Sequence, residues 1–589
     1  KRRTSVSRMT ALHSPLFTLR SRQSSLRIYT SGRDSAIMSQ CNLKETSLVT
    51  LAGATNSHSL TELRLKDHPT LLGVGTRLSA EVIADRAADI GVKDHYLVVE
   101  SENCRLLGVK ALSRYRILEV GITNGPIETL ARAIDYIETD WIIINPITTV
   151  PSLTTLEPAI YFGNKPCMQE SWSSVVIDET ERQPTFVFKS SPEKHRKSYP
   201  FTGVICAKTS HVRAALASKK DLDNQDLLSL AAILFAYKQV RLDFAEWLDI
   251  GHVATYGRTR LSLISSRFFN SVYYNELTGS IIKYSSNATK LRNEAEYYQR
   301  AALPIKRYFP RVYASKPGPE AGSWEIEIEH LPGKSLAEIF LYGNYSPSEI
   351  LLIVDRLFDV FSQIYSGKPI CKGSNGWLYE KKLVERKEML EQYCQLHPSG
   401  IIRQAWDNST IVNNAMEVPP LKDLFRQAEE SLSIIGSESE FYYGHGDLCF
   451  NNIMVEPTYG YIRLIDPKSS VDPQNELLGL ADAKYDLAKL YHSSECLYDA
   501  IVNNLFRLVK EGNHYSFYVF MPNTGSLLQD EINKRILQQL SANELAAITT
   551  SLFLSMIPLH NESEERMLSF AFIACALLQG LPISRFHLS

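Results

Sequence analysis

The chain has 589 residues, of which 44% are hydrophobic and 22% charged, and its formal net charge is -2. This length exceeds what one hydrophobic core supports, so we expect two to four domains; the near-neutral charge gives no reason to expect nucleic acid or an anionic membrane as a partner. Nine scattered cysteines without a C-x-x-C pair favour reduced thiols in a cytoplasmic protein over a disulfide framework or a zinc site.

The first 44 residues are rich in arginine and serine and contain no acid before Asp34. Organelle transit peptides have this composition, but the chain opens on lysine, and Met9 or Met38 could be the natural start. We therefore expect residues 1–44 to be a disordered leader outside the fold.

Residues 45–255 alternate strand-like and helix-like segments. We expect strands at 47–53, 95–101 and 140–146 and helices at 80–92 and 125–138. This alternation is typical of a Rossmann-like α/β domain with a parallel sheet. The segment 246–260 is expected to link this domain to the next. The longest apolar stretches, 227–237 and 570–578, are too short to cross a bilayer, so no transmembrane segment is predicted.

The pattern changes to α+β in the second half of the chain. Residues 256–332 predict a β-rich lobe with a turn at Glu276–Gly279, followed by a strand that carries Lys283. Residues 333–589 predict a mostly helical lobe, interrupted by a pair of strands around 441–466. The expected architecture is therefore two-lobed.

The stretch "YYGHGDLCFNNIMVEP" (442–457) places Asp447 on a short turn and Asn452 ahead of an apolar strand. Phosphoryl transfer needs a carboxylate to orient the attacking hydroxyl and metal ions on the phosphates. Asp447 can accept the hydroxyl proton, and the side-chain oxygen of Asn452 can bind Mg²⁺. Asp466 ends the next apolar strand, so a tight turn between the two strands would bring Asn452 and Asp466 to one metal site.

An upstream pair completes the pattern. Lys283 follows a hairpin, and Glu294 lies on the next predicted helix, where it could hold the lysine against the α- and β-phosphates of ATP. Each element alone has an ordinary interpretation: His-Gly-Asp as a turn, the lysine as a solvated edge residue, and Glu294 as a surface acid with Glu296 as its rival. Their order and their strand or helix context favour the functional interpretation.

Together, His445-Gly446-Asp447, Asn452 and Asp466, with Lys283 and Glu294 ahead, resemble the aminoglycoside phosphotransferase and choline kinase family over roughly residues 260–589. This resemblance implies a protein-kinase-like fold. It also implies a catalytic His-Gly-Asp motif with Asp447 as the acid/base residue and His445 beside it, two magnesium ligands, Asn452 and Asp466, and ATP as phosphate donor.

The same resemblance implies further roles. Asp486 in "LADAKYDLAKLYHS" would tie the catalytic loop to the helical lobe. Backbone groups near Glu329 and Leu331 in "EIEIEHLPGKSL" would bind adenine. The loop "SRFFN" lacks the glycines usual for the first two strands, so Arg267 and Asn270 would cover the phosphates.

The front domain resembles a sugar-phosphate nucleotidyltransferase in "VTLAGATNSHSL", where the family has a strand followed by L-A-G-G-x-G-x-R. Gly53 matches, but Ala54, Asn56 and His58 stand where further glycines and the arginine belong. The lysine that follows proline in the family is missing from "KDHPTLL".

The metal-binding G-D-x-x-P of that family appears as "NPITTVP" (145–151), without a carboxylate, and only Asp249 stands at a second metal position. Loss of these charges removes most of the electrostatic stabilisation that nucleotidyl transfer needs. We expect the fold to persist, either with a retained nucleotide or sugar pocket or as a scaffold. The segment 248–270 also resembles bacterial capsule and surface-polysaccharide proteins that join the two domain types.

The sequence thus predicts an ATP- and Mg²⁺-dependent kinase that phosphorylates a compact polar alcohol, such as a sugar, an amino alcohol or a hydroxy acid. One alternative is a non-catalytic nucleotide- or sugar-binding regulatory protein. Another is a nucleotidyltransferase that acts through the front domain.

Overall fold

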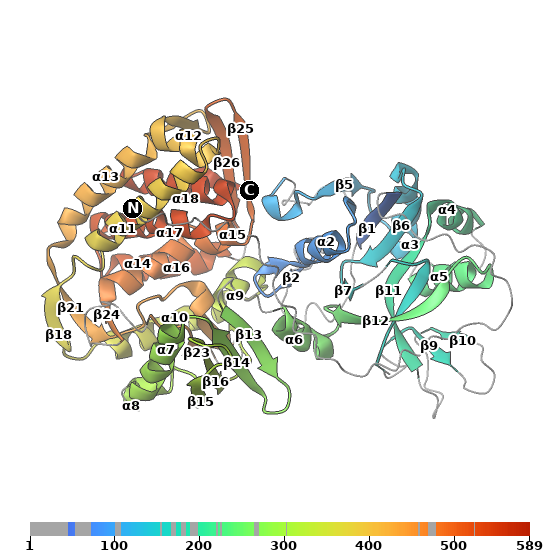
Figure 1. Ribbon diagram of the computed structural model, residues 1–589, viewed down its shortest axis with the longest axis horizontal. Coiled ribbons are helices and arrows are strands. Elements are labelled where there is room, and N and C mark those ends of the chain that lie inside the picture. The colour runs from blue at the N-terminus through green and yellow to red at the C-terminus, as the bar shows by residue number, and fades with distance from the viewer. Residues whose placement is uncertain are drawn as a thin grey trace, which may run out of the picture.

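The computed structural model describes residues 45–53, 72–100, 108–153, 156–165, 172–177, 184–188, 198–218, 222–223, 226–263, 270–301, 303–456, 460–468, 479–522 and 525–588. A blue-to-green α/β body lies on one side of the molecule, and an orange-to-red helical body with a small green sheet beneath it lies on the other (Figure 1).

The front body is built on a large sheet with the strand order β5-β4-β1-β6-β11-β8-β12-β7. Its strands are β1 (Thr46–Ala52), β4 (Asp94–Val99), β5 (Tyr115–Glu119), β6 (Trp141–Pro146), β7 (Thr149–Ser152), β8 (Ala159–Gly163), β11 (Ser198–Lys208) and β12 (Arg241–Asp249). The strands β9 (Ser174–Ile177) and β10 (Pro184–Val187) form a hairpin beside β11.

The sheet is mixed, which corrects the prediction of a parallel sheet. Strands β5, β4, β1 and β6 run parallel, as do β8 and β12, but β11 is antiparallel to both β6 and β8. Parallel neighbours need a crossover connection. The described part of the chain between β6 and β11 contains only strands, so β11 enters in the opposite direction.

Helices cover both faces of this sheet. One core holds apolar residues of α3 (Pro126–Ala133), α4 (Thr209–Ser218) and α5 (Leu227–Ala236). The other face packs against α2 (Ser79–Asp89). Neighbouring strand residues belong to different cores, as with Ile142 and Ile143, because side chains alternate across a sheet.

The β-rich lobe is an antiparallel sheet with the order β13-β14-β16-β15. Its elements are β13 (Asn270–Asn275), β14 (Ser280–Ser285), β15 (Val312–Pro317), β16 (Trp324–Glu329), α7 (Ala288–Arg300) and α8 (Leu303–Lys306). Helix α7 packs on β15 and β16. The helix starts at a cap, since the Asn287 side chain accepts from the Lys290 N–H at 3.1 Å. Lys283 and Glu294 therefore come from two elements that are packed together.

The helical lobe contains ten helices among the described residues: α9 (Leu336–Tyr342), α10 (Pro347–Tyr365), α11 (Glu380–Leu396), α12 (Ile401–Asp407), α13 (Leu421–Ser431), α14 (Ala483–Ser494), α15 (Tyr498–Val502), α16 (Gly525–Leu537), α17 (Ala542–Met556) and α18 (Glu564–Leu578). Two small sheets frame the site, β17-β22-β23 and β18-β21-β24. Their strands are β17 (Lys334–Ser335), β18 (Cys371–Ser374), β21 (Glu438–Tyr443), β22 (Ile453–Glu456), β23 (Tyr461–Leu464) and β24 (Leu480–Asp482).

A further sheet was not predicted. It consists of β19 (Thr410–Val412), β20 (Met416–Val418), β25 (Phe506–Glu511), β26 (His514–Phe520) and β27 (His587–Leu588). In β26 the buried residues Tyr515, Phe517 and Val519 alternate with more exposed ones. This period of two is the signal that could have revealed the hairpin.

One apolar segment was also overlooked. Ala542–His560 is long and apolar enough to cross a membrane by length and composition, but 67% of its most apolar window is buried inside the structure. Helix α17 packs against α11, α13, α14 and α18. It is a core helix of this lobe.

The two bodies are joined by packed structure. The predicted linker 246–260 is instead the end of β12 followed by α6 (Val253–Ser262). Arg260 of α6 donates from Nε and Nη2 to the two carboxylate oxygens of Glu338 on α9, at 2.6 and 2.8 Å. Both side chains are largely buried, so this ion pair fixes α6 against the helical lobe.

A short hairpin makes a second connection. Strands β2 (Gly73–Val74) and β3 (Arg77–Leu78) lie against α9, where the Tyr342 hydroxyl donates to the Thr76 carbonyl at 2.9 Å. A Cβ atom at Gly73 would overlap the Tyr342 ring. One hydrophobic cluster includes Val74, Leu78 and Tyr342, so the core is continuous between the bodies.

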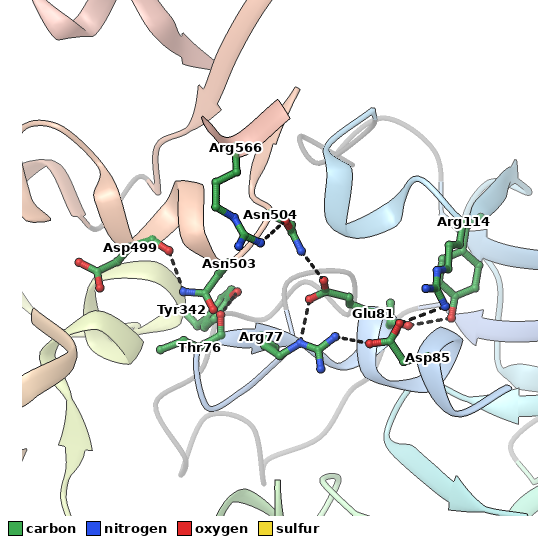
Figure 2. Close-up of polar contacts among 12 residues, drawn as sticks. Thr76, Arg77, Glu81, Asp85, Arg114, Tyr342, Asp499, Asn503, Asn504 and Arg566 are labelled. Carbon is green, nitrogen blue, oxygen red and sulfur yellow. Dashed lines mark hydrogen bonds and ion pairs between the residues drawn. The ribbon is translucent and has the colours of Figure 1, made fainter. Parts of the chain in front are cut away.

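Polar groups complete the contact, as Figure 2 shows. Glu81 of α2 accepts from Arg77 Nε at 3.2 Å and from Asn504 Nδ2 at 2.8 Å. Arg566 of α18 in turn donates to Asn504 Oδ1 at 2.9 Å. These groups line a polar cavity of about 400 Å³ between the bodies.

Candidate active site

The His-Gly-Asp turn follows β21, and hydrogen bonds to α14 hold it in place. Asp486 of α14 accepts hydrogen bonds from the backbone N–H groups of Gly446 and Leu448, at 3.0 and 3.2 Å, and from the Tyr365 hydroxyl. Gly446 has φ +73°, a left-handed conformation that favours glycine. Asp486 lies where the sequence placed it, between the loop and the helical lobe, and is fully buried.

The Asp447 side chain lies at the surface of this turn and is 38% exposed. Its Oδ1 is 2.9 Å from Nζ of Lys489, which is itself buried. Burial would raise the pKa of Asp447, but the Lys489 ammonium outweighs it and holds the pKa well below its usual value. The carboxylate is therefore ionised and accessible at neutral pH.

Asn452 and Asp466 are brought together by the β22–β23 hairpin. Ile453 pairs with Leu464, and the Ile465 N–H donates to the Asn452 carbonyl at 3.0 Å, so Asp466 lies just beyond Asn452. Asn452 Nδ2 donates to the Asp447 carbonyl at 2.9 Å, which orients the amide. Asp466 has φ +54°, a left-handed conformation that short polar residues tolerate.

Lys283 lies between two carboxylates. Its Nζ donates to Glu294 Oε1 at 2.8 Å and also contacts Asp466 Oδ1. Burial lowers the pKa of Lys283, but Asp466 and Glu294 together raise it above its usual value, so the amine stays charged. The Lys283–Glu294 pair matches the predicted pairing and links it to the loop end at Asp466.

Tyr298 also connects these groups, although the sequence did not single it out for the site. Its hydroxyl donates to Glu294 Oε1 at 3.0 Å and accepts from the Asp466 N–H at 3.0 Å. The position i+4 from Glu294 places it on the same face of α7.

His445 does not have the position predicted for a catalytic residue. Its ring is fully buried; Nε2 lies 2.9 Å from the Ile465 carbonyl, and Nδ1 accepts from the Asp447 N–H at 3.2 Å. Both ring nitrogens are occupied by backbone groups, so the ring cannot reach a substrate. His445 instead joins the catalytic turn to the strand end before Asp466.

The expected adenine contacts lie at the end of β16. The Glu329 N–H donates to the Arg311 carbonyl at 2.8 Å, so this N–H is not available to a nucleotide. The Glu329 side chain binds Arg463 at 2.8 Å, which connects the small sheet to β23. Leu331 follows directly and is buried. Arg267 lies outside the described residues, and Asn270 begins β13, opposite Ser285.

Lys489 is the functional candidate that the sequence analysis missed. Asp482, Asp486, Lys489 and Ser493 share one face of α14 by their spacing. Asp482 caps the helix by accepting from the Lys484 N–H at 2.8 Å, and Ser493 Oγ accepts from the Phe450 N–H at 3.1 Å. The spacing of Lys489, one helical turn after Asp486, is the sequence signal that could have placed it beside the His-Gly-Asp turn.

The front domain shows a structural role for its remaining acid. Asp249 accepts from the backbone N–H groups of Gly251 and His252, both at 3.2 Å, and from the Thr255 hydroxyl. It thereby stabilises the start of α6. Asn145 is fully buried and donates to the Thr149 carbonyl at 2.9 Å. Most of the two phosphate-binding segments predicted around Gly53 and 66–72 lies outside the described residues.

No protein-family model and no curated protein matches the chain. Among solved structures, an aminoglycoside phosphotransferase, APH(4)-Ia, is similar at 11% identity over 54% of this chain and 93% of its own, with a TM-score of 0.35. A structure described as a glucose-1-phosphate thymidylyltransferase from Bacillus anthracis is similar at 15% identity over 38% of this chain and 97% of its own, with a TM-score of 0.29. A UDP-glucose pyrophosphorylase is similar at 12% identity over 37% of this chain and 97% of its own, with a TM-score of 0.30.

These neighbours include both kinds of enzyme fold that the sequence resembled. All the TM-scores are below 0.5, so we base no functional inference on them.

Proposed function

We propose that the protein is an ATP- and Mg²⁺-dependent phosphotransferase that acts on an alcohol group of a small polar metabolite. One observation supports this most strongly: the ionised, partly exposed carboxylate of Asp447 lies on the same loop as Asn452, and Asp466 beyond it contacts the buried Lys283–Glu294 pair. Phosphoryl transfer depends on positioning and electrostatics, which is what these groups provide.

Asp447 would orient the acceptor hydroxyl towards the γ-phosphorus. The hydroxyl oxygen forms a bond to phosphorus, the bond from phosphorus to the β–γ bridging oxygen breaks with its electron pair leaving on ADP, and the hydroxyl proton passes to Asp447. Because the pKa of Asp447 is low, orientation is its main contribution and the proton moves late.

The residues at the loop end fit a magnesium site. Among the described residues, three or more His, Cys, Asp or Glu side chains nowhere gather as a preformed metal cage. Mg²⁺ bound to a nucleotide needs only one or two protein oxygens, and Asn452 and Asp466 supply an amide and a carboxylate. When bound, the ion would neutralise charge on the phosphates.

The nucleotide would lie between the two lobes. Lys283 would bind the α- and β-phosphates once ATP and metal separate it from Asp466. The Glu329 carbonyl and the Leu331 N–H are the proposed adenine contacts, and Arg267 and Asn270 the proposed phosphate cover. His445 is proposed to hold the catalytic turn.

The test is transfer of labelled γ-phosphate from ATP to acceptors in a metabolite extract, with wild-type protein and the variants Asp447→Asn and Asp466→Asn. We expect each variant to lose on the order of 10²–10⁴-fold in rate. The exposed Asp359 on α10 provides a matched control, and Asp359→Asn should behave as wild type. Undiminished transfer by either site variant would contradict the mechanism.

The same experiment separates the regulatory alternative. A non-catalytic nucleotide-binding protein would show a higher melting temperature with ATP but would transfer no phosphate to any acceptor. A cytoplasmic location and a surface-polysaccharide context stay predictions from the sequence.

A further inference from the structure

Three lysines gather beside Asp447 on the side of the helical lobe. Lys489 of α14 is 2.9 Å from the Asp447 carboxylate. Lys382 of α11 lies 2.5 Å from the Tyr485 hydroxyl, with its Nζ 5.0 Å from the centre of that ring. Lys468, two residues after Asp466, lies over the same ring at 5.6 Å. The buried ring of Tyr485 thus lies beside two lysine amino groups close to the His-Gly-Asp turn.

Among the described residues, Asp447 is the acid that opposes the positive charge of this group. Within the described residues, Asp447 is paired with Lys489, whereas Lys382 and Lys468 form no ion pair with a carboxylate. Both amino groups lie over the Tyr485 ring, 5.0 and 5.6 Å from its centre. Like charges at this separation repel each other, and a bound anion would remove the repulsion.

Arg386 adds a fourth cation one turn after Lys382 on α11. Its Nε is buried without a hydrogen-bond acceptor among the described residues, and one of its terminal nitrogens reaches only the Met389 sulfur, a weak acceptor. Burial, followed by repulsion from Lys468 and Lys489, lowers the pKa of Lys382 well below its usual value. An anion placed here would stabilise the charged form of Lys382.

Two lysines of this cluster, Lys382 and Lys489, lie on other elements than the groups proposed to hold ATP. Lys283 on β14, with Glu294 and Asp466, already provides a cation for the nucleotide phosphates. Lys382 and Lys489 come from α11 and α14 of the helical lobe, and the Asp447 charge acts on both amino groups. An acceptor whose hydroxyl is bound by Asp447 would meet these lysines with its remaining groups.

We propose that the acceptor carries an anionic group, a phosphate or a carboxylate, in addition to the alcohol that is phosphorylated, and that Lys382 and Lys468 bind this group. The inference rests on the proposed kinase function, since it assigns the acceptor side of the same site. Amino alcohols without an acidic group are then poor acceptors. Sugar phosphates and hydroxy acids are the favoured classes.

Binding is the first test, using full-length protein saturated with Mg²⁺-ADP. Glucose 6-phosphate, glycerate, glucose, glycerol and inorganic phosphate are titrated by calorimetry at constant ionic strength. We expect the anions to bind at least about tenfold more tightly than their neutral parents, and Lys382→Gln or Lys468→Gln to remove this preference. Equal binding of anions and neutral parents, or a preference unchanged in both variants, would overturn the proposal.

Matched variants control for folding and for general charge. Lys381→Gln changes the exposed neighbour of Lys382 on the same helix and should leave anion binding intact. Lys382→Arg keeps the charge and should retain most of the binding, whereas a merely structural defect would not be rescued. The phosphate and carboxylate probes distinguish the two sources of the negative charge.

Kinetics distinguish this proposal from the function on which it rests. The lysine variants should raise KM for an anionic acceptor about tenfold and leave KM for ATP unchanged; a rise confined to ATP would assign the cluster to the nucleotide and refute the proposal. If Asp447→Asn transfers phosphate as fast as wild type, the kinase mechanism fails, while anion binding that depends on Lys382 would still stand.

Discussion

The ionisation of Asp447 depends on one neighbour. Burial favours the protonated carboxyl, and the ammonium of Lys489 at 2.9 Å reverses this preference. An acid whose pKa is depressed in the folded protein is ionised at every pH above its ordinary value. Turnover by the wild type should therefore show no loss from protonation of Asp447 between about pH 5 and 9.

Replacing Lys489 by methionine should expose this dependence. The pKa of Asp447 would rise, because burial is no longer opposed, and the rate should fall about tenfold and decline further as the pH is lowered. The measurement is kcat/KM from pH 5 to 9. Lys484→Met, at the start of the same helix and paired with Glu544, is the control. An unchanged profile in Lys489→Met would show that Asp447 does not need this charge.

The shifted pKa of Asp499 should make the free energy of unfolding depend on pH. Burial raises the pKa of Asp499 to about 7, so the folded protein keeps a proton that the unfolded chain loses above about pH 4. Unfolding then releases this proton, and the free energy of unfolding falls by about 1.4 kcal/mol per pH unit between these values. Stability from this group is present at low pH and lost as the pH approaches 7.

Asp499→Asn should remove that contribution. As the pH rises from 5 to 8, the free energy of unfolding of the wild type should fall more than that of the variant, so the variant becomes relatively more stable. Urea titrations at several pH values measure it. Parallel curves for the two proteins would mean that Asp499 ionises normally in the folded state.

Helix α14 organises the site through one face. Asp482 caps the helix and also accepts from the Tyr379 hydroxyl at 2.9 Å and Ser439 Oγ at 2.6 Å; Asp486, Lys489 and Ser493 then meet the catalytic loop in turn. A single helix thereby positions the turn, sets the charge of Asp447 and anchors the start of the following strand.

Asp486→Ala should loosen the turn without removing a group that touches substrate. Two buried N–H groups lose their acceptor, which we expect to cost about 2–5 kcal/mol of stability. The value of kcat should fall more than KM for ATP changes, because Lys283 and the proposed adenine contacts lie on the other lobe. Loss of ATP binding equal to the loss of turnover would argue against a positioning role.

Local spacing in the sequence placed Asn452 and Asp466 at the end of one hairpin, with Asp447 on the turn before it and Glu294 on the helix directly after Lys283. The roles of these residues stay predictions. The burial of His445 and its backbone partners could not be predicted, because they depend on tertiary packing. Lys382 went unnoticed for a similar reason, since α11 and the catalytic turn are distant in the chain. The direction of β11 likewise depends on how connections cross the sheet, which residue patterns do not record.

The front domain and the two-lobed region after it should unfold together. Arg260 and Glu338 form a largely buried ion pair between them, and the hydrophobic cluster runs through the contact. An interface with a continuous core favours a single cooperative transition, although most multidomain chains unfold in steps.

Arg260→Met tests this coupling. The change leaves Glu338 buried without its partner, and we expect a loss of about 3–5 kcal/mol and a lower melting temperature for the whole molecule. Calorimetry should show one transition in the wild type. Adding Glu338→Leu should recover part of the loss, which a double-mutant cycle quantifies. Two separate transitions in the wild type would contradict the coupling.

The close packing of Gly73 against the Tyr342 ring restricts which substitutions the two positions tolerate during evolution. A front-domain glycine is restricted by a tyrosine 269 positions later, because any larger residue at 73 would collide with the Tyr342 ring. Substitutions at these two sites should therefore be inherited as pairs, with bulk gained at one accompanied by bulk lost at the other.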